Sequence, residues 1–139
     1  MHFHSITKIL SDIFFKKDFS ILDLKSMSEA EKDIFAEYVS KCRIESFFLN
    51  QIEPHLVSQS LGERNYLKLK NNGNIRAIRT LENLRFAKKI HKELNLQNID
   101  HVFLKGINMH KYFYQKNPSL RPLSDIDILV KKEDLVEVI

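Results

Sequence analysis

The chain has 139 residues, which is enough for one domain with a core of its own and short for two. Hydrophobic residues make up 43% and charged residues 29%, a balance that is typical of soluble globular proteins and excludes wholesale disorder. The formal net charge of +4 suits phosphate-bearing partners without requiring nucleic acid.

The only cysteine of the sequence, Cys42, cannot form an internal disulfide. It falls within a helical pattern, so we expect it to pack in the core of a protein from a reducing compartment. No run of about 18 apolar residues predicts a membrane span, and the first residues lack the layout of a signal peptide. We therefore expect a cytoplasmic protein.

The first part of the chain has the periodicity of helices. Apolar residues recur at helical spacing near the start, which predicts an amphipathic helix over residues 5–16 and a connecting segment over 18–27. Ser28 and Glu31 then form a capping-box pattern. The apolar stripe that follows predicts a helix that continues to about Ile52 and is closed by Pro54.

Residues 57–94 have a helical pattern again, interrupted by the run Asn71-Asn72-Gly73-Asn74. This run is either a turn or a weak point within one long helix. The second half of the segment has an apolar side and a basic side. A solvated face is the favoured interpretation of the basic side, and contact with phosphate or RNA is the alternative.

After Leu94 the pattern changes to short apolar runs. We expect two strands joined by a helix and followed by a last helix, at residues 99–104, 107–114, 126–130 and 131–139. The fold class is therefore α+β, with a helical region over residues 1–94 packed as one unit with a mixed core over residues 95–139.

The most informative residues are Asp125 and Asp127, which lie in an apolar run that ends at Val130. Side chains alternate along a strand, so both carboxylates would point to one face with their Cα atoms about 7 Å apart. Two anions this close repel each other unless they stay solvated or a cation lies between them. A hard divalent cation is the obvious candidate, and a solvent-facing acidic strand is the alternative.

A second motif follows the first expected strand, where Lys105 and Gly106 precede a helix. Gly106 permits a tight turn and a close approach of another backbone. The amide groups that open the helix favour an anion, and Lys105 adds a positive charge suited to phosphate. An ordinary lysine at a strand end is the alternative for Lys105.

Together, Leu104-Lys105-Gly106 and Arg121-Pro122-Leu123-Ser124-Asp125-Ile126-Asp127-Ile128-Leu129-Val130 resemble the uncharacterised nucleotidyltransferase family of the DNA polymerase β-like superfamily. The resemblance implies a partial nucleotidyltransferase core built as strand, turn, helix and strand. It also implies Mg²⁺-dependent transfer of a nucleoside monophosphate from an NTP, with ATP preferred, to an acceptor that the sequence does not identify.

The same resemblance assigns roles to six residues. Asp125 and Asp127 are the catalytic metal ligands, for Mg²⁺ or Mn²⁺. The residues expected at the nucleotide are Lys105, Gly106, Arg121 and Ser124. Without a metal, Arg121 would pair with one of the two carboxylates.

The chain departs from the family pattern at two points. Ile107 follows Gly106 where many superfamily members have serine. The superfamily fold also takes a third carboxylate from a later strand, whereas Glu133, Asp134 and Glu137 fall on the expected last helix. We therefore expect an N-terminal portion or a truncated form, whose site is incomplete unless a later segment adds a ligand.

Two other functions remain open. A catalytically inactive binding module, or one completed by an oligomer or partner chain, would use the unpaired edges of a two-stranded sheet. A glycosyltransferase also holds a metal with an Asp-x-Asp pair, but it needs a nucleotide-binding α/β half before the motif, where this chain has helices. His101 and His110 lack convergent metal-ligand spacing, so we expect surface or packing roles for both.

Overall fold

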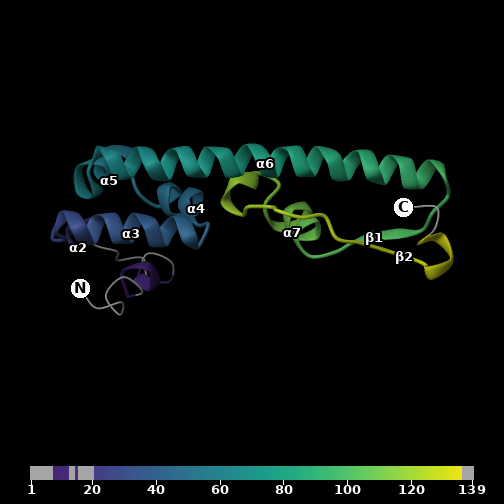
Figure 1. Ribbon diagram of the computed structural model, residues 1–139, viewed down its shortest axis with the longest axis horizontal. Coiled ribbons are helices and arrows are strands. Elements are labelled where there is room, and N and C mark those ends of the chain that lie inside the picture. Colours follow the sequence, from purple (N-terminus) through teal and green to yellow (C-terminus); the bar gives the residue numbers. More distant parts are fainter. Residues whose placement is uncertain (1–7, 13–14, 16–20, 136–139) are drawn as a thin grey trace. The chain divides into compact units, whose positions relative to one another are not determined.

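The structure is a computed structural model that describes residues 8–12, 15 and 21–135. The chain divides into two compact units, Met1–Asn74 and Ile75–Ile139, which we call the N-terminal unit and the C-terminal unit. The fold is mostly helical with a small two-stranded antiparallel sheet near the C-terminus (Figure 1). This agrees with the helical region and the short strands expected from the sequence. The boundary expected after residue 94 stays a prediction.

The N-terminal unit is built from short helices. In chain order they are α2 (Ile21–Lys25), α3 (Glu29–Lys41), α4 (Glu45–Asn50), α5 (Pro54–Leu61) and the start of α6 (Glu63–Leu96). Of the helix expected over residues 5–16, residues 8–12 and 15 are described, and they are helical. The prediction of a connecting segment over residues 18–27 is wrong at Ile21–Lys25, which form α2.

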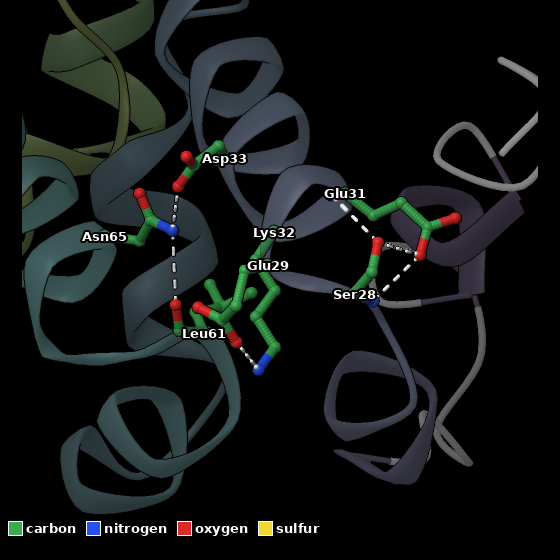
Figure 2. Close-up of polar contacts among 7 residues, drawn as sticks. All are labelled: Ser28, Glu29, Glu31, Lys32, Asp33, Leu61 and Asn65. Atoms are coloured by element: carbon green, nitrogen blue, oxygen red, sulfur yellow. Dashed lines mark hydrogen bonds and ion pairs between the residues drawn. The ribbon is translucent and has the colours of Figure 1, made fainter.

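Helix α3 begins at the predicted capping box, which is confirmed (Figure 2). The Glu31 backbone N–H donates to Ser28 Oγ at 3.4 Å, and the Ser28 backbone N–H donates to Glu31 Oε2 at 2.8 Å. These bonds satisfy two amide groups that a helix start leaves without partners. The bond from the Ser28 backbone also lowers the pKa of the Glu31 carboxyl.

The predicted continuation of this helix to Ile52 is wrong, because α3 ends at Lys41. Arg43 takes a left-handed backbone conformation with φ of 57°. Its N–H donates to the Ser40 carbonyl, and the Ile44 N–H donates to the Val39 carbonyl. This is a Schellman motif, a helix ending that glycine usually makes, formed here with arginine. Cys42 lies at this end and is exposed, so its predicted place in the core is also wrong.

Pro54 opens α5 as its first residue and does not close the preceding helix. Proline suits this position because the first amide of a helix has no partner inside the helix. A short break at Gly62, with φ of 80°, separates α5 from α6.

Helix α6 runs without interruption through Asn71–Asn74, so the second of the two interpretations of this run is correct. Gly73 is buried there, and a Cβ atom on it would lie 3.0 Å from Ser46 Oγ. The Asn72 side chain donates to Ser40 Oγ at 3.1 Å. Contacts with α3 and α4 therefore keep this weak helical sequence in the helix.

The core of the N-terminal unit is apolar. Its largest fully buried rings are those of Phe35 and Phe48, which meet edge to face with centroids 5.5 Å apart. Asn65 is a buried polar residue at the edge of this core. It donates to Asp33 Oδ1 at 2.8 Å and to the Leu61 carbonyl at 3.2 Å (Figure 2). Hydrogen bonds from Arg64 and, second, from Asn65 lower the pKa of Asp33.

The C-terminal unit contains the remainder of α6 and a small sheet. Its other elements are β1 (His101–Phe103), α7 (Gly106–Phe113), the 3₁₀ helix η1 (Pro118–Leu120), β2 (Ile128–Val130) and the 3₁₀ helix η2 (Lys132–Asp134). The strands pair antiparallel, with His101 opposite Val130 and Phe103 opposite Ile128. Figure 1 shows the two strands beside each other beyond α7.

Both strands are shorter than expected. Helix α6 ends in a second Schellman motif, in which Asn98 has φ of 57° and the Ile99 N–H donates to the Leu94 carbonyl. This leaves fewer residues for β1. The described part of the expected last helix is η2 followed by helical residue 135, and residues 136–139 lie outside the described part.

No helix in the described part of the chain is long and apolar enough to cross a membrane.

Candidate functional site

The two aspartates lie just before β2 and not within it. The strand begins at Ile128, so Asp125 and Asp127 belong to an irregular segment, and their predicted placement inside a strand is wrong. The Leu104 N–H nevertheless donates to the Asp127 carbonyl at 2.9 Å, which continues the antiparallel pairing by one residue. Asp127 is therefore held against the end of β1, while Asp125 is exposed.

Lys105 forms the turn between β1 and α7. Its dihedral angles are φ 47° and ψ −114°, a combination that glycine adopts more readily than a residue with a side chain. The strained residue of this turn is thus Lys105, not the glycine after it.

Gly106 is the first residue of α7 and is needed for a different reason. A Cβ atom on it would collide with Cδ1 of Leu123, whose side chain is buried. The group that lies close to Gly106 is thus the side chain two residues before Asp125 and not another backbone. The approach of this turn to phosphate stays a prediction.

Leu123 fixes the aspartate segment to α6 through its backbone. The Leu123 N–H donates to Thr80 Oγ1 at 3.0 Å, and the Leu123 carbonyl accepts from the Asn83 side chain at 2.8 Å. Thr80 is fully buried. Sequence reasoning missed these two positioning residues, because nothing local marks a contact across some 40 residues.

An ion pair connects the turn with the aspartates. Lys105 Nζ lies 3.0 Å from Asp127 Oδ2. This hydrogen bond and the charge of Asp127 raise the pKa of Lys105, and the charge of Asp125 adds to the rise. Asp125 is therefore close enough to Lys105 for its charge to be felt. The structure thus brings together Lys105, Asp125 and Asp127 beside Gly106.

The remaining predicted residues lie around this group. Ser124 Oγ donates to Asp125 Oδ1 at 3.3 Å. Arg121 is exposed and makes no ion pair with a described residue, so the expected pairing of Arg121 with a carboxylate is absent there. Lys105 provides that positive charge instead.

A family model described as uncharacterised nucleotidyltransferase matches residues 21–139. The chain belongs to this family. Comparisons with curated proteins and with solved structures find no match. The matched range includes both motifs that carried the resemblance, so the family predicted from Leu104–Gly106 and Arg121–Val130 is confirmed.

Members of nucleotidyltransferase families typically depend on a metal. The side chains of this family member that could act as metal ligands are the two aspartates. The described residues contain no group of three side chains with metal-ligand geometry. Magnesium, however, is commonly held by one or two carboxylates together with substrate phosphates and water. Asp127 already accepts a cationic ammonium group, and Asp125 lies near it. The oxygen donors of these two side chains are therefore of the kind that suits a divalent cation which also contacts phosphate.

The two histidines near the turn take no part in this group. His110 is 3% exposed on α7, and its ring packs against that of Tyr114 with centroids 5.7 Å apart. His101 on β1 is half-buried, and its Nε2 lies 2.7 Å from Nδ1 of His91 on α6. Both residues pack within the C-terminal unit, in agreement with the packing role expected for them.

Proposed function

We propose that this chain carries the nucleotide site of a Mg²⁺-dependent nucleotidyltransferase, which transfers a nucleoside monophosphate from an NTP, preferably ATP, to an acceptor. The observation that carries the proposal is the 3.0 Å contact of Lys105 Nζ with Asp127 Oδ2, with Asp125 in electrostatic reach. One cation and two carboxylates at the start of a helix are the groups that a metal-bound triphosphate requires. Family membership supports the same reaction class.

Asp125 and Asp127 would hold the metal. When bound, Mg²⁺ would offset negative charge on the transferred phosphoryl group and on the pyrophosphate that leaves. Mn²⁺ prefers similar oxygen ligands and would substitute for it. Ser124, which donates to Asp125, keeps that carboxylate oriented.

Lys105 and the start of α7 would contact the phosphates. The ammonium group of Lys105 is charged at neutral pH. The first amide groups of a helix have no partners inside the helix, and the helix dipole favours an anion there. When the nucleotide enters, Lys105 would leave Asp127 and bind a phosphate oxygen. Arg121, which is exposed and lies four residues before Asp125 in the sequence, would add a second positive charge.

The test is Mg²⁺-dependent binding of ATP, measured by isothermal titration calorimetry, together with release of pyrophosphate. We expect Asp125→Asn and Asp127→Asn each to lower the Mg²⁺-dependent affinity at least about tenfold, because each removes one anionic ligand. Glu133→Gln is the matched control, since Glu133 is an exposed acidic residue soon after β2. Equal binding by the wild type and both aspartate variants would contradict the proposal.

A binding module without catalysis is the second candidate function. It is favoured by a sheet of two strands of three residues each, whose outer face carries Val102 and Leu129 at 53% and 58% exposure. Unpaired strand edges readily accept another chain. ATP binding without release of pyrophosphate at any metal concentration would select this candidate.

A further inference from the structure

A cavity of about 700 Å³ lies within the C-terminal unit, between the second half of α6 and α7. Its lining comes from residues 81–91 of α6, from Phe103 of β1, and from α7 and the segment that follows it to Pro118. Pockets that bind small molecules have volumes of about 300–1,000 Å³, so this cavity has a suitable size.

All formal charges in the lining are positive. They belong to Arg85 and Lys88 of α6 and Lys111 of α7, and the lining contains no aspartate or glutamate. Arg85 and Lys88 make no ion pair with a described residue, while Lys111 Nζ lies 5.5 Å from the centroid of the Tyr112 ring. Three cations without local acidic partners raise the local concentration of anions.

The rest of the lining is largely apolar and aromatic. Leu81, Leu84, Ile107, Phe103 and Tyr114 all contribute to it. Leu81 is 53% exposed, which leaves a large apolar side chain in contact with water. A ligand with an apolar body would remove this surface from water, which favours binding.

The cavity shares no residue with the aspartate group. The His91 ring contacts the rings of His101 and Phe103, with centroids 4.9 Å and 6.2 Å away, so these alternate residues of β1 face α6. Val102 and its partner Leu129 point away from α6 and are exposed. Lys105, Asp125 and Asp127 are all absent from the cavity lining.

We infer that this cavity is a second binding site, which takes a small amphiphilic anion: an apolar body with a carboxylate or phosphate group. The apolar body would lie against Leu81, Phe103 and Ile107, and the anionic group would lie among Arg85, Lys88 and Lys111. The inference does not depend on the proposed transferase activity, because it uses none of the residues assigned to that activity.

The test uses octanoate and octan-1-ol, which share one apolar chain and differ in charge. Methyl resonances of the full chain would be followed by NMR during titration with each compound. We expect octanoate to bind at least about tenfold more tightly than octan-1-ol, because only octanoate pairs with the three cations. The methyl groups that shift should be those of Leu81, Leu84 and Ile107.

Three variants make the test specific. Lys88→Glu should weaken octanoate binding about tenfold, whereas Lys89→Glu, the matched control on the next residue outside the lining, should change it less than about threefold. Leu81→Trp should remove binding of both compounds by filling the cavity from an exposed position. The dispersion of each NMR spectrum reports whether the variant is folded.

Equal affinity for octanoate and octan-1-ol would overturn the inference, and so would equal loss of binding in the Lys88 and Lys89 variants or unchanged binding in Leu81→Trp. Asp127→Asn should bind octanoate as the wild type does. Loss of ATP binding together with intact octanoate binding would therefore separate the two sites.

Discussion

The two units of the chain are stabilised in different ways. The N-terminal unit has a continuous core of buried apolar side chains that includes Leu24, Phe35, Phe48 and Leu61. In the C-terminal unit the described buried apolar side chains are fewer, namely Ala87, Leu94, Ile99 and Leu123, and most of the large apolar side chains that are exposed in the described part of the chain belong to this unit.

The larger core and the candidate site therefore belong to different units. The aspartates, the Lys105 turn and the cavity all belong to the unit with the smaller core, where a few buried polar contacts hold the segments in place. We therefore expect substitutions in the two units to have different effects.

The largest expected effect is in the core of the N-terminal unit. Phe35→Ala removes a fully buried ring and leaves a cavity beside Phe48, which should lower the free energy of unfolding by about 3–5 kcal/mol. Urea unfolding followed by circular dichroism measures this loss. Ile34→Ala, the matched control on the next residue of α3, is 56% exposed and should cost less than about 1 kcal/mol. Equal losses of unfolding free energy in the two variants would mean that this unit lacks the apolar core described above.

A smaller and more local effect is expected at Thr80. Thr80→Val keeps the shape of the side chain but leaves the buried Leu123 N–H without its acceptor, at a cost of about 1–3 kcal/mol. Hydrogen exchange of the Leu123 amide should become faster in this variant. Thr80→Ser keeps the hydroxyl group and should preserve the protection of that amide. Unchanged exchange in Thr80→Val would show that Thr80 does not hold the aspartate segment.

The smallest effect concerns His110, whose two ring nitrogens are buried without a hydrogen-bond partner among the described residues. Burial lowers the pKa of His110; the backbone of Arg121 opposes this lowering, and the charge of Arg121 adds to it. Because the unfolded chain protonates this histidine near its ordinary pKa of 6.5 and the folded chain only at lower pH, stability should fall as the pH drops below about 6.5.

His110→Phe removes this titration. The free energy of unfolding of the variant should therefore exceed that of the wild type by an amount that grows as the pH decreases, by at most about 1.4 kcal/mol per pH unit. At pH 8 the variant should be more stable by about 1 kcal/mol, because it removes an unpaired buried polar group. Thermal unfolding between pH 5 and pH 8 measures both effects. A parallel pH dependence of the two proteins would place the His110 nitrogens in contact with water.

Local signals made part of the fold predictable. The capping box at Ser28 and Glu31 uses residues three positions apart, and its prediction holds. The glycine turn before α7 was likewise readable from adjacent residues, and α7 begins within one residue of its expected position. The two motifs also identified the family.

Features that depend on distant contacts could not be predicted in the same way. The end of α3 requires a left-handed arginine at position 43, where sequence rules expect glycine or asparagine. Asn71–Asn74 stays helical through contacts with Ser40 and Ser46 that lie some 30 residues away. The anchoring of Leu123 by Thr80 and Asn83 depends on the same kind of long-range contact.

At position 105 the backbone conformation favours glycine, whereas the ion pair with Asp127 requires lysine. Glycine would relieve the unfavourable dihedral angles there, which cost on the order of 1–3 kcal/mol in a residue with a side chain. The same exchange would delete the ammonium group that faces Asp127. Directed evolution for heat resistance would thus favour a variant at this position that has lost its ion pair with Asp127 and, with it, the proposed contact with the nucleotide. Screens of this chain should therefore score thermal tolerance and ATP affinity separately.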